Sequence, residues 1–127
     1  MDTIKVSEIM SRKLVTARED ETLAEVGVKM LESKVSSVVI TSDDKVEGIV
    51  TEKDYVKFFT LRVSPDEKVR SYMTRNVITV KEDVSLNTAK NIMVSNRIRH
   101  LPVVDEKGRA VGMVTARDII ESVETLI

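Results

Sequence analysis

The first half of the chain carries apolar residues in two different periods, one typical of helices and one typical of strands. Over residues 22–33 apolar side chains recur every three or four positions, which predicts an amphipathic helix. Thr22 is followed by a glutamate three residues later, and this capping-box pattern should mark the start of the helix. The runs at residues 37–41 and 46–51 predict the two strands of a hairpin. A further helix is expected over residues 52–59.

The second half of the chain repeats this order. We expect a helix over residues 85–96, strands over 101–104 and 110–115, and a final helix over 116–125. Each half should also open with a helical turn and an extended piece, at residues 4–10 and 14–16 and again at residues 69–73 and 77–80. Each half therefore predicts an α+β unit in which helices cover one side of a small sheet.

One motif ends both halves. The sequence GIVTEKD at residues 48–54 returns as GMVTARD at residues 112–118. Upstream of the motif, residues recur at an offset of 63, as Thr16 and Thr79 do, whereas the motif itself recurs at an offset of 64. The second copy thus carries one extra residue ahead of its motif. A repeat of this length decides the fold before any single residue is considered.

The repeat sets the expected domain organisation. We expect one repeat over residues 1–61, a linker over residues 62–67 that contains Pro65, and a second repeat over residues 68–127. A unit of about sixty residues buries only about 60% of its unfolded surface and is marginally stable alone. Two such halves should need each other, and functional sites are expected where they meet.

Composition narrows the class of protein. The chain is 42% hydrophobic and 32% charged, which is typical of a globular protein. A net charge of −1 argues against a nucleic-acid partner, and the absence of cysteine excludes disulfides and thiolate sites. No apolar run reaches the roughly 18 residues of a membrane span, and no signal-peptide pattern opens the chain, so a cytoplasmic protein is expected. The lack of glutamine and the many lysines, arginines and glutamates lean toward a thermophilic source.

The motif permits a structural and a functional interpretation. Thr51 with Asp54, and Thr115 with Asp118, each have the spacing of a capping box at a helix start. A helix start also offers free N–H groups that suit phosphate. An aspartate one turn later can accept hydrogen bonds from the two hydroxyls of a ribose. The two interpretations are compatible.

Two basic residues precede the predicted hairpin of the second half, and the matching place in the first half lacks them. Arg99, His100 and Pro102 lead into a predicted strand, where the matching stretch of the first half contains Ser36 and Ser37. These basic residues could form surface salt bridges, or they could bind phosphate, whose geometry the arginine fork matches. His100 is the only histidine, so no histidine-based metal site is expected.

Other side chains near the motif also have two interpretations. Lys53 and Arg117 precede the motif aspartates and could reach a phosphate or pair along the helix. Tyr55, Phe58 and Phe59 could stack on a base, but core or subunit contacts are the favoured interpretation.

The chain resembles the cystathionine-β-synthase (CBS) domain, which occurs in tandem pairs called Bateman modules. The resemblance covers about residues 4–124 and is carried by repeated strings in a fixed order: IMSRKLVT, YMTRNVITV, RHLPVVDEKGRAVGMVT, GIVTEKD and GMVTARD. It implies two α+β repeats packed sheet to sheet about a pseudo-two-fold axis, with two clefts between them. It also implies binding of AMP, ADP, ATP or S-adenosylmethionine, and a homodimer.

The resemblance also assigns roles to residues. The motif aspartates resemble ribose-binding residues, the threonines resemble ribose or phosphate contacts, and Val15-Thr16 and Ile78-Thr79 resemble residues that line the base. The implied nucleotide-binding residues are Thr16, Thr51, Lys53, Asp54, Ile78, Thr79, Arg99, His100, Pro102, Thr115, Arg117 and Asp118. Carried over, Thr51 and Asp54 share one site with Arg99 and His100, and Thr115 and Asp118 share the other with Ser36 and Ser37. The first site should prefer phosphate-bearing ligands, and the second should be weaker, empty or suited to a less charged adenosine compound.

The expected function is that of a stand-alone regulatory module that signals to an effector protein. We expect no enzyme activity, catalytic residue, catalytic cofactor or metal, because the sequence offers no nucleophile–base pair and no metal-ligand cluster. The alternatives are a ligand-independent dimerisation or assembly module, an S-adenosylmethionine sensor, and a nucleotide enzyme that uses His100.

Overall fold

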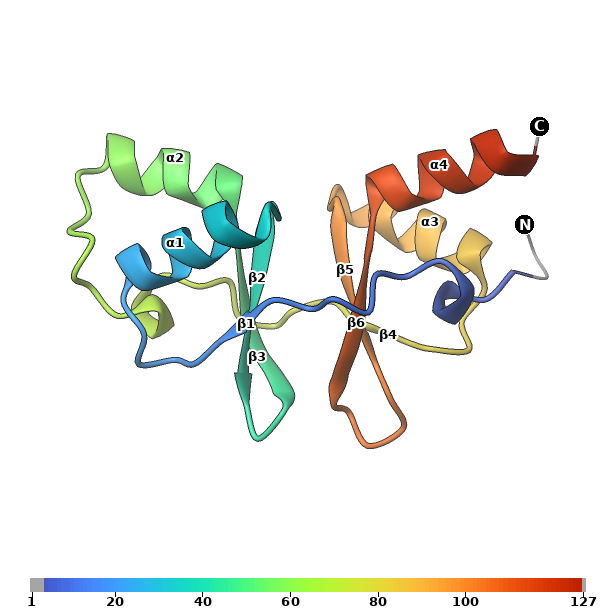
Figure 1. The fold of residues 1–127 in the computed structure, drawn as a ribbon, viewed down its shortest axis with the longest axis horizontal. Helices are drawn as coiled ribbons and strands as arrows, with labels where there is room; N and C mark the ends of the chain where they lie inside the picture. Colours follow the sequence, from blue (N-terminus) through green and yellow to red (C-terminus); the bar gives the residue numbers. More distant parts are fainter. Residues whose placement is uncertain (1–3, 127) are drawn as a thin grey trace. The chain divides into compact units, whose positions relative to one another are not determined.

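The computed structural model describes residues 4–126, with side chains described up to residue 123 (Figure 1). The elements of the first half are η1 (Val6–Glu8), β1 (Thr16–Ala17), α1 (Leu23–Ser33), β2 (Ser37–Ser42), β3 (Lys45–Thr51) and α2 (Glu52–Thr60). Those of the second half are η2 (Val69–Ser71), β4 (Val80–Lys81), α3 (Leu86–Asn96), β5 (His100–Val104), β6 (Ala110–Thr115) and α4 (Ala116–Leu126). The predicted α+β fold with two similar repeats is confirmed. No helix among the described residues has both the length and the apolar character needed to cross a membrane.

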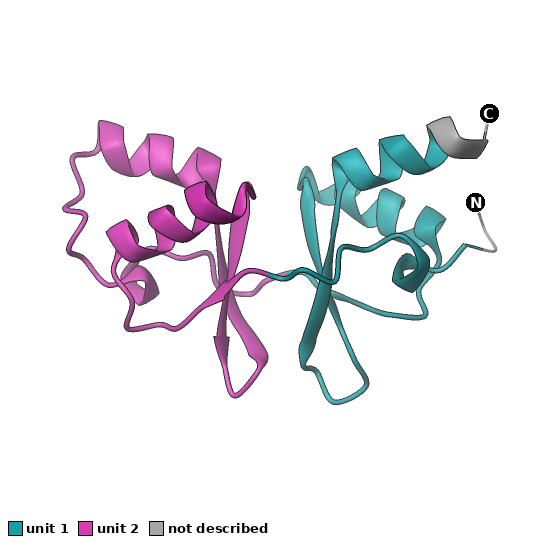
Figure 2. Cartoon of the chain, viewed as in Figure 1, with its two compact units in different colours: residues 1–14, 78–127 teal, residues 15–77 magenta. Residues whose placement is uncertain are grey.

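The chain forms two compact units that do not coincide with the sequence repeats (Figure 2). Unit 2 contains residues 15–77, and unit 1 contains residues 1–14 together with residues 78–127. The opening segment of the chain therefore joins the strands of the second repeat, and η2 joins the strands of the first. Each unit is one compact body made from parts of both sequence repeats.

Each unit has a three-stranded sheet with the same topology. The order is β1-β2-β3 in unit 2 and β4-β5-β6 in unit 1, with the first pair parallel and the second antiparallel. Both helices of a unit lie on the same side of its sheet, as the sequence pattern predicted (Figure 1). The hairpins contain equivalent register shifts, between Ile40 and Thr41 and between Val103 and Val104. The extra residue of the second copy therefore lies in the turn that follows, where Gly108 has a φ of 81°.

The glycines of the motif explain why each unit contains a segment of the other sequence repeat, an arrangement that we call the exchange of segments. A Cβ atom at Gly48 would lie 2.5 Å from Met73 Sδ, and one at Gly112 would lie 2.7 Å from Met10 Sδ. Each methionine packs on the glycine of the other sequence repeat. Backbone hydrogen bonds of 2.9 and 3.0 Å join Ser11 and Met113 beside the second contact. The missing side chain thus makes room for a segment that is distant in sequence.

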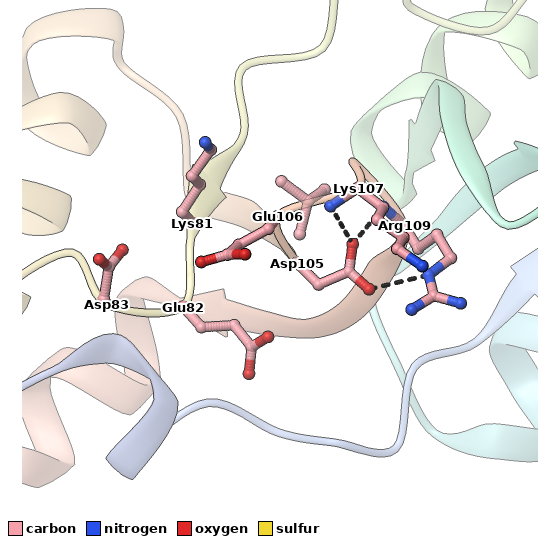
Figure 3. A pocket seen from close by; sticks show the side chains of 8 residues that line it. Lys81, Glu82, Asp83, Asp105, Glu106, Lys107 and Arg109 are labelled. Atoms are coloured by element: carbon pink, nitrogen blue, oxygen red, sulfur yellow. Dashed lines mark hydrogen bonds and ion pairs between the residues drawn. The ribbon is translucent and has the colours of Figure 1, made fainter.

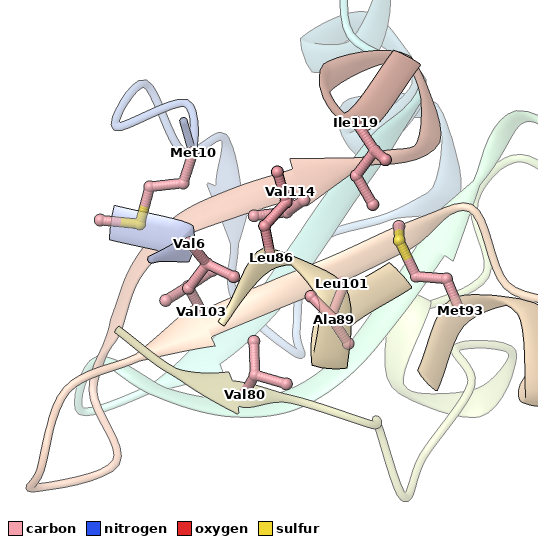
Figure 4. Packing of buried hydrophobic residues seen from close by; sticks show 10 residues of the cluster. All are labelled: Val6, Met10, Val80, Leu86, Ala89, Met93, Leu101, Val103, Val114 and Ile119. Atoms are coloured by element: carbon pink, nitrogen blue, oxygen red, sulfur yellow. The ribbon is translucent and has the colours of Figure 1, made fainter. Parts of the chain in front are cut away.

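Each unit has its own apolar core. In unit 1 the core lies between the sheet, the two helices and η1 (Figure 4). Its buried residues are Val6, Met10, Val80, Leu86, Ala89, Met93, Leu101, Val103, Val114 and Ile119. The equivalent cluster of unit 2 consists of Ala17, Leu23, Val26, Met30, Val38, Ile40, Val50, Phe58, Val69 and Met73. The two clusters hold both motif helices firmly against their sheets.

Candidate functional site

The motif aspartates cap the helices that follow the hairpins. Asp54 Oδ2 accepts hydrogen bonds from the Thr51 N–H at 2.8 Å and from Thr51 Oγ1 at 3.3 Å. Asp118 Oδ2 accepts from the Thr115 N–H at 2.8 Å, and Thr115 Oγ1 accepts from the Asp118 N–H at 3.2 Å. The capping interpretation is therefore confirmed at both helix starts. Among the described residues no hydrogen bond reaches Oδ1 of either aspartate, and both aspartates are partly exposed.

The basic residues next to the motif aspartates differ from each other. Arg117 Nε lies 2.9 Å from Glu121 Oε1, and both side chains are exposed. An exposed pair of this kind contributes about 0.3–0.5 kcal/mol to stability. The helix-pairing interpretation holds for Arg117. Lys53 is exposed and forms no ion pair with any described residue.

The structure places Arg99 and His100 beside the motif of their own repeat. His100 pairs with Thr115 in the antiparallel ladder, and the Ala116 N–H donates to the Arg99 carbonyl at 3.0 Å. The same backbone geometry in unit 2 puts Ser37 opposite Thr51. The strand partner of Thr115 is therefore a histidine, and that of Thr51 is a serine. The predicted association of Arg99 and His100 with Asp54 stays a prediction.

Pro102 acts through the backbone of the predicted base-lining segment. In unit 2 the Val39 N–H donates to the Val15 carbonyl at 3.1 Å. Pro102 holds the place of Val39 in unit 1 and has no N–H to donate to the Ile78 carbonyl. The parallel ladder of unit 1 consequently starts one residue later than that of unit 2. It begins at Val80, whereas the equivalent of Thr16 is Thr79. Both strands also start later than the sequence pattern suggested.

Lys29 and Glu21 were missed by the sequence reasoning. Lys29 Nζ, on α1, donates to the Thr16 carbonyl oxygen at 2.9 Å and lies 2.9 Å from Glu21 Oε1. Both side chains are partly buried. A comparison of the two repeats could have indicated that Lys29 has a specific role, because it aligns with the apolar Ile92 in the helix of the second copy.

The aromatic residues after the first motif belong mainly to the core of unit 2. Tyr55 Oη donates to the Leu23 carbonyl at 2.6 Å, and its ring meets Phe58 edge to face. Burial, followed by the nearby charge of Asp54, raises the pKa of Tyr55 to about 12. The core interpretation is confirmed for Tyr55 and Phe58. Phe59 is 84% exposed.

A hollow of about 690 Å³ in unit 1 contains none of the predicted site residues (Figure 3). It is lined by Lys81, Glu82, Asp83, Val104, Asp105, Glu106, Lys107 and Arg109. Asp105 closes the adjacent turn by accepting from the backbone of Lys107 and Arg109 at 2.9 Å each. The bond from the Arg109 backbone is the main cause that holds the pKa of Asp105 below its usual range. No group of three or more acidic or histidine side chains among the described residues is arranged to hold a metal ion.

Comparison with known proteins identifies the family. The family model of the CBS domain matches residues 6–60 and 69–125. The chain is 40% identical to uncharacterized protein MK0525 of Methanopyrus kandleri over 124 residues, which are 95% of this chain and 63% of that protein. The chain thus spans less than two thirds of that relative's length.

Solved structures agree with the family match. The CBS domain pair of protein MJ0100, in complex with 5′-methylthioadenosine and S-adenosyl-L-methionine, superimposes with a TM-score of 0.91 at 28% identity, covering 98% of this chain and 99% of that one. CBS domain protein PAE2072 of Pyrobaculum aerophilum, complexed with AMP, gives a TM-score of 0.87 at 26% identity, covering 96% and 99%. With two matched repeats that span most of its length, the chain belongs to the CBS-domain family and contains a pair of CBS domains.

Proposed function

We propose that this CBS pair binds an adenosine-containing ligand and passes the binding event to an effector protein. The observation that carries the proposal is the available Oδ1 atom of each motif aspartate at a capped helix start. A carboxylate oxygen in that place can accept hydrogen bonds from a ribose, as in dinucleotide-binding folds. The adenosine compounds bound by the two similar CBS proteins support the same ligand class.

The proposed ligand contacts follow the sequence-based assignment. Thr51 and Asp54 would bind together with Arg99 and His100, and Lys53 would assist with phosphate. Thr115 and Asp118 would bind together with Ser36 and Ser37, with Arg117 as an additional phosphate contact. Thr16, Ile78, Thr79 and Pro102 would shape the surroundings of the base. This arrangement favours AMP, ADP or ATP at Asp54 and a less charged adenosine compound at Asp118.

A sensor of S-adenosylmethionine is a second candidate. The pair in MJ0100 binds this compound and 5′-methylthioadenosine, and the residues proposed to complete the Asp118 site, Ser36 and Ser37, add no charge to it. A ligand panel therefore has to include S-adenosylmethionine beside the nucleotides.

The proposed role is regulatory and non-enzymatic, in the cytoplasm. Signalling requires that the ligand binds one conformation of the chain or its assembly more tightly than another. A homodimer would supply such an assembly. Exposed apolar side chains at equivalent places of both repeats support it: Leu31 and Val94, Val56 and Ile120, and Phe59 and Val123. An apolar hollow on unit 1 includes two of them, Val94 and Ile120.

Thermal unfolding with a ligand panel tests the proposal. AMP, ADP, ATP or S-adenosylmethionine at millimolar concentration should raise the melting temperature through mass action. Asp54→Ala and Asp118→Ala should each reduce the rise when it is measured from the variant's own unliganded value. Because both changes also remove a helix cap, Glu25→Ala is the matched control. It removes the equivalent 3.0 Å bond to the Thr22 N–H on α1 and should leave the ligand-induced rise unchanged. No rise with any of the four compounds contradicts the proposal.

A further inference from the structure

The two units build the same backbone around their predicted base-lining segments. The Glu21 carbonyl accepts from the Val69 N–H at 2.8 Å, and the Val84 carbonyl accepts from the Val6 N–H at 2.9 Å. The Glu21 N–H donates to the Arg18 carbonyl at 3.1 Å, and the Val84 N–H donates to the equivalent carbonyl, that of Lys81, at 3.2 Å. The backbone conformation at this place is therefore the same in both units, although the side chains at equivalent positions differ.

The side chains at this place differ as a pair. Unit 2 has Glu21 and Lys29, which form an ion pair at 2.9 Å. Unit 1 has Val84 and Ile92 at the same positions, and both pack against its core. Since unit 1 makes the same backbone turn with two apolar residues, the ion pair is not needed for the fold. The feature that unit 2 has in addition is the hydrogen bond from Lys29 Nζ to the Thr16 carbonyl.

The result is a difference in free hydrogen-bond acceptors. In unit 2 the Val15 carbonyl accepts from the Val39 N–H at 3.1 Å, and the Thr16 carbonyl accepts from Lys29 at 2.9 Å. In unit 1 neither the Ile78 carbonyl nor the Thr79 carbonyl accepts a hydrogen bond from any residue that the structure describes. Each carbonyl of the Val15-Thr16 segment therefore already holds one hydrogen bond, whereas neither carbonyl of the Ile78-Thr79 segment has a donor among the described residues.

We propose that Lys29 and Pro102 determine base specificity by setting how readily each base-lining segment accepts a hydrogen bond from the ligand. The inference rests on the proposed binding of adenosine compounds. The Ile78-Thr79 segment accepts from the exocyclic amino group of a 6-aminopurine, and the Val15-Thr16 segment does so less readily because its two carbonyls already have donors. A 6-oxopurine has a carbonyl at the 6-position and its donor at N1, so it cannot donate from the place of the amino group. The two units therefore differ in their preference for the base, apart from any difference in phosphate binding.

Calorimetric titration of the full chain with AMP and with IMP measures this preference, because the two nucleotides differ at the purine 6-position. An acceptor placed for the 6-amino group should make AMP bind about two- to tenfold more tightly than IMP to the wild-type chain. The double variant Glu21→Val/Lys29→Ile gives unit 2 the side chains of unit 1. It should open a second acceptor and strengthen the preference for AMP.

The reciprocal variant Val84→Glu/Ile92→Lys is the matched control, since it exchanges the same side chains in the opposite direction. It should place an ammonium on the Thr79 carbonyl and bring the AMP-to-IMP ratio toward one. Lys29→Met and Pro102→Val test the same two effects with less change to the core. The first should raise the ratio. The second should lower it, because valine restores an N–H for the Ile78 carbonyl.

The outcomes separate this inference from the proposed function. The inference is supported if the ratio of AMP to IMP affinity changes in opposite directions in the two double variants, or in the two single variants. A loss of stability alone would weaken the binding of both nucleotides equally. Equal affinity for AMP and IMP in the wild type, or one unchanged ratio in all variants, overturns the inference while nucleotide binding stands. A wild-type chain that binds neither nucleotide overturns both.

Discussion

Adding a methyl group to either motif glycine should destabilise the chain, and the cost should be larger at Gly112 than at Gly48. At Gly48 the nearest atoms to a new Cβ all belong to the flexible Met73 side chain, at 2.5, 2.7 and 3.1 Å. At Gly112 the new Cβ meets Met10 Sδ at 2.7 Å and also the backbone oxygen of Ser11 at 2.9 Å. A side chain can change rotamer, but a paired backbone cannot move without losing its partners.

The expected magnitudes follow from these contacts. Overpacking costs about 1–3 kcal/mol, and the lower entropy of the unfolded chain with alanine returns about 0.4–1 kcal/mol. Gly48→Ala should therefore cost roughly 0.5–2 kcal/mol. Relief at Gly112 requires moving Ser11, whose two backbone bonds with Met113 are worth about 0.5–1.5 kcal/mol each. Gly112→Ala should cost roughly 2–4 kcal/mol.

Urea unfolding followed by far-ultraviolet circular dichroism measures both free energies. A second substitution distinguishes the two mechanisms through a double-mutant cycle. Met73→Val should recover most of the cost of Gly48→Ala, because it removes the side chain that supplies the three nearest atoms. Met10→Val should recover less than half of the cost of Gly112→Ala. Equal recovery at both places, or a cost below about 0.5 kcal/mol at Gly112, would refute the assigned contacts and with them the reason given for the exchange of segments.

Further predictions concern a core tyrosine, a helix cap and the apolar surface. Tyr55→Phe removes the bond to the Leu23 carbonyl and should cost about 0.5–1.5 kcal/mol in urea unfolding. The folded pKa of Tyr55, about 12, lies above the ordinary tyrosine value of 10.0, so the contribution of Tyr55 to stability should be present below pH 10 and lost as the pH rises through 12, which ultraviolet titration can follow. Thr22→Ala should cost about 1 kcal/mol in the same unfolding assay, because it removes the cap bond to the Glu25 N–H. Phe59→Lys should convert a dimer to a monomer in sedimentation experiments if this exposed residue lies in the proposed interface; an unchanged mass would exclude Phe59 from it.

Local sequence signals predicted the elements well. The capping box of Thr22 with Glu25, and the repeated box of the motif, each act over three residues, so the sequence contains the whole interaction. The helix after Ser85 is likewise capped by that serine, whose side chain accepts from the Thr88 N–H at 3.1 Å. Periodicity and caps together gave most element boundaries to within one or two residues.

Contacts between distant segments could not be predicted in the same way. The packing of Met73 on Gly48 assigns a segment to a unit, and nothing in the local pattern around either residue specifies the partner. The bond from Lys29 to the Thr16 carbonyl was missed for a similar reason, because a lysine on a helix is usually read as a solvent-facing residue. The effect of Pro102 depends on strand register, which the sequence leaves open.

The most direct test of the central claim is equilibrium dialysis of the full chain against AMP and, separately, S-adenosylmethionine at millimolar concentrations. We expect saturable binding of at least one of these compounds to the wild-type chain and to the Glu25→Ala control. The double variant Asp54→Ala/Asp118→Ala should lose that binding while it keeps its circular dichroism spectrum. Binding of neither compound to the wild-type chain, or undiminished binding to the folded double variant, would contradict a ligand-binding role for the motif aspartates.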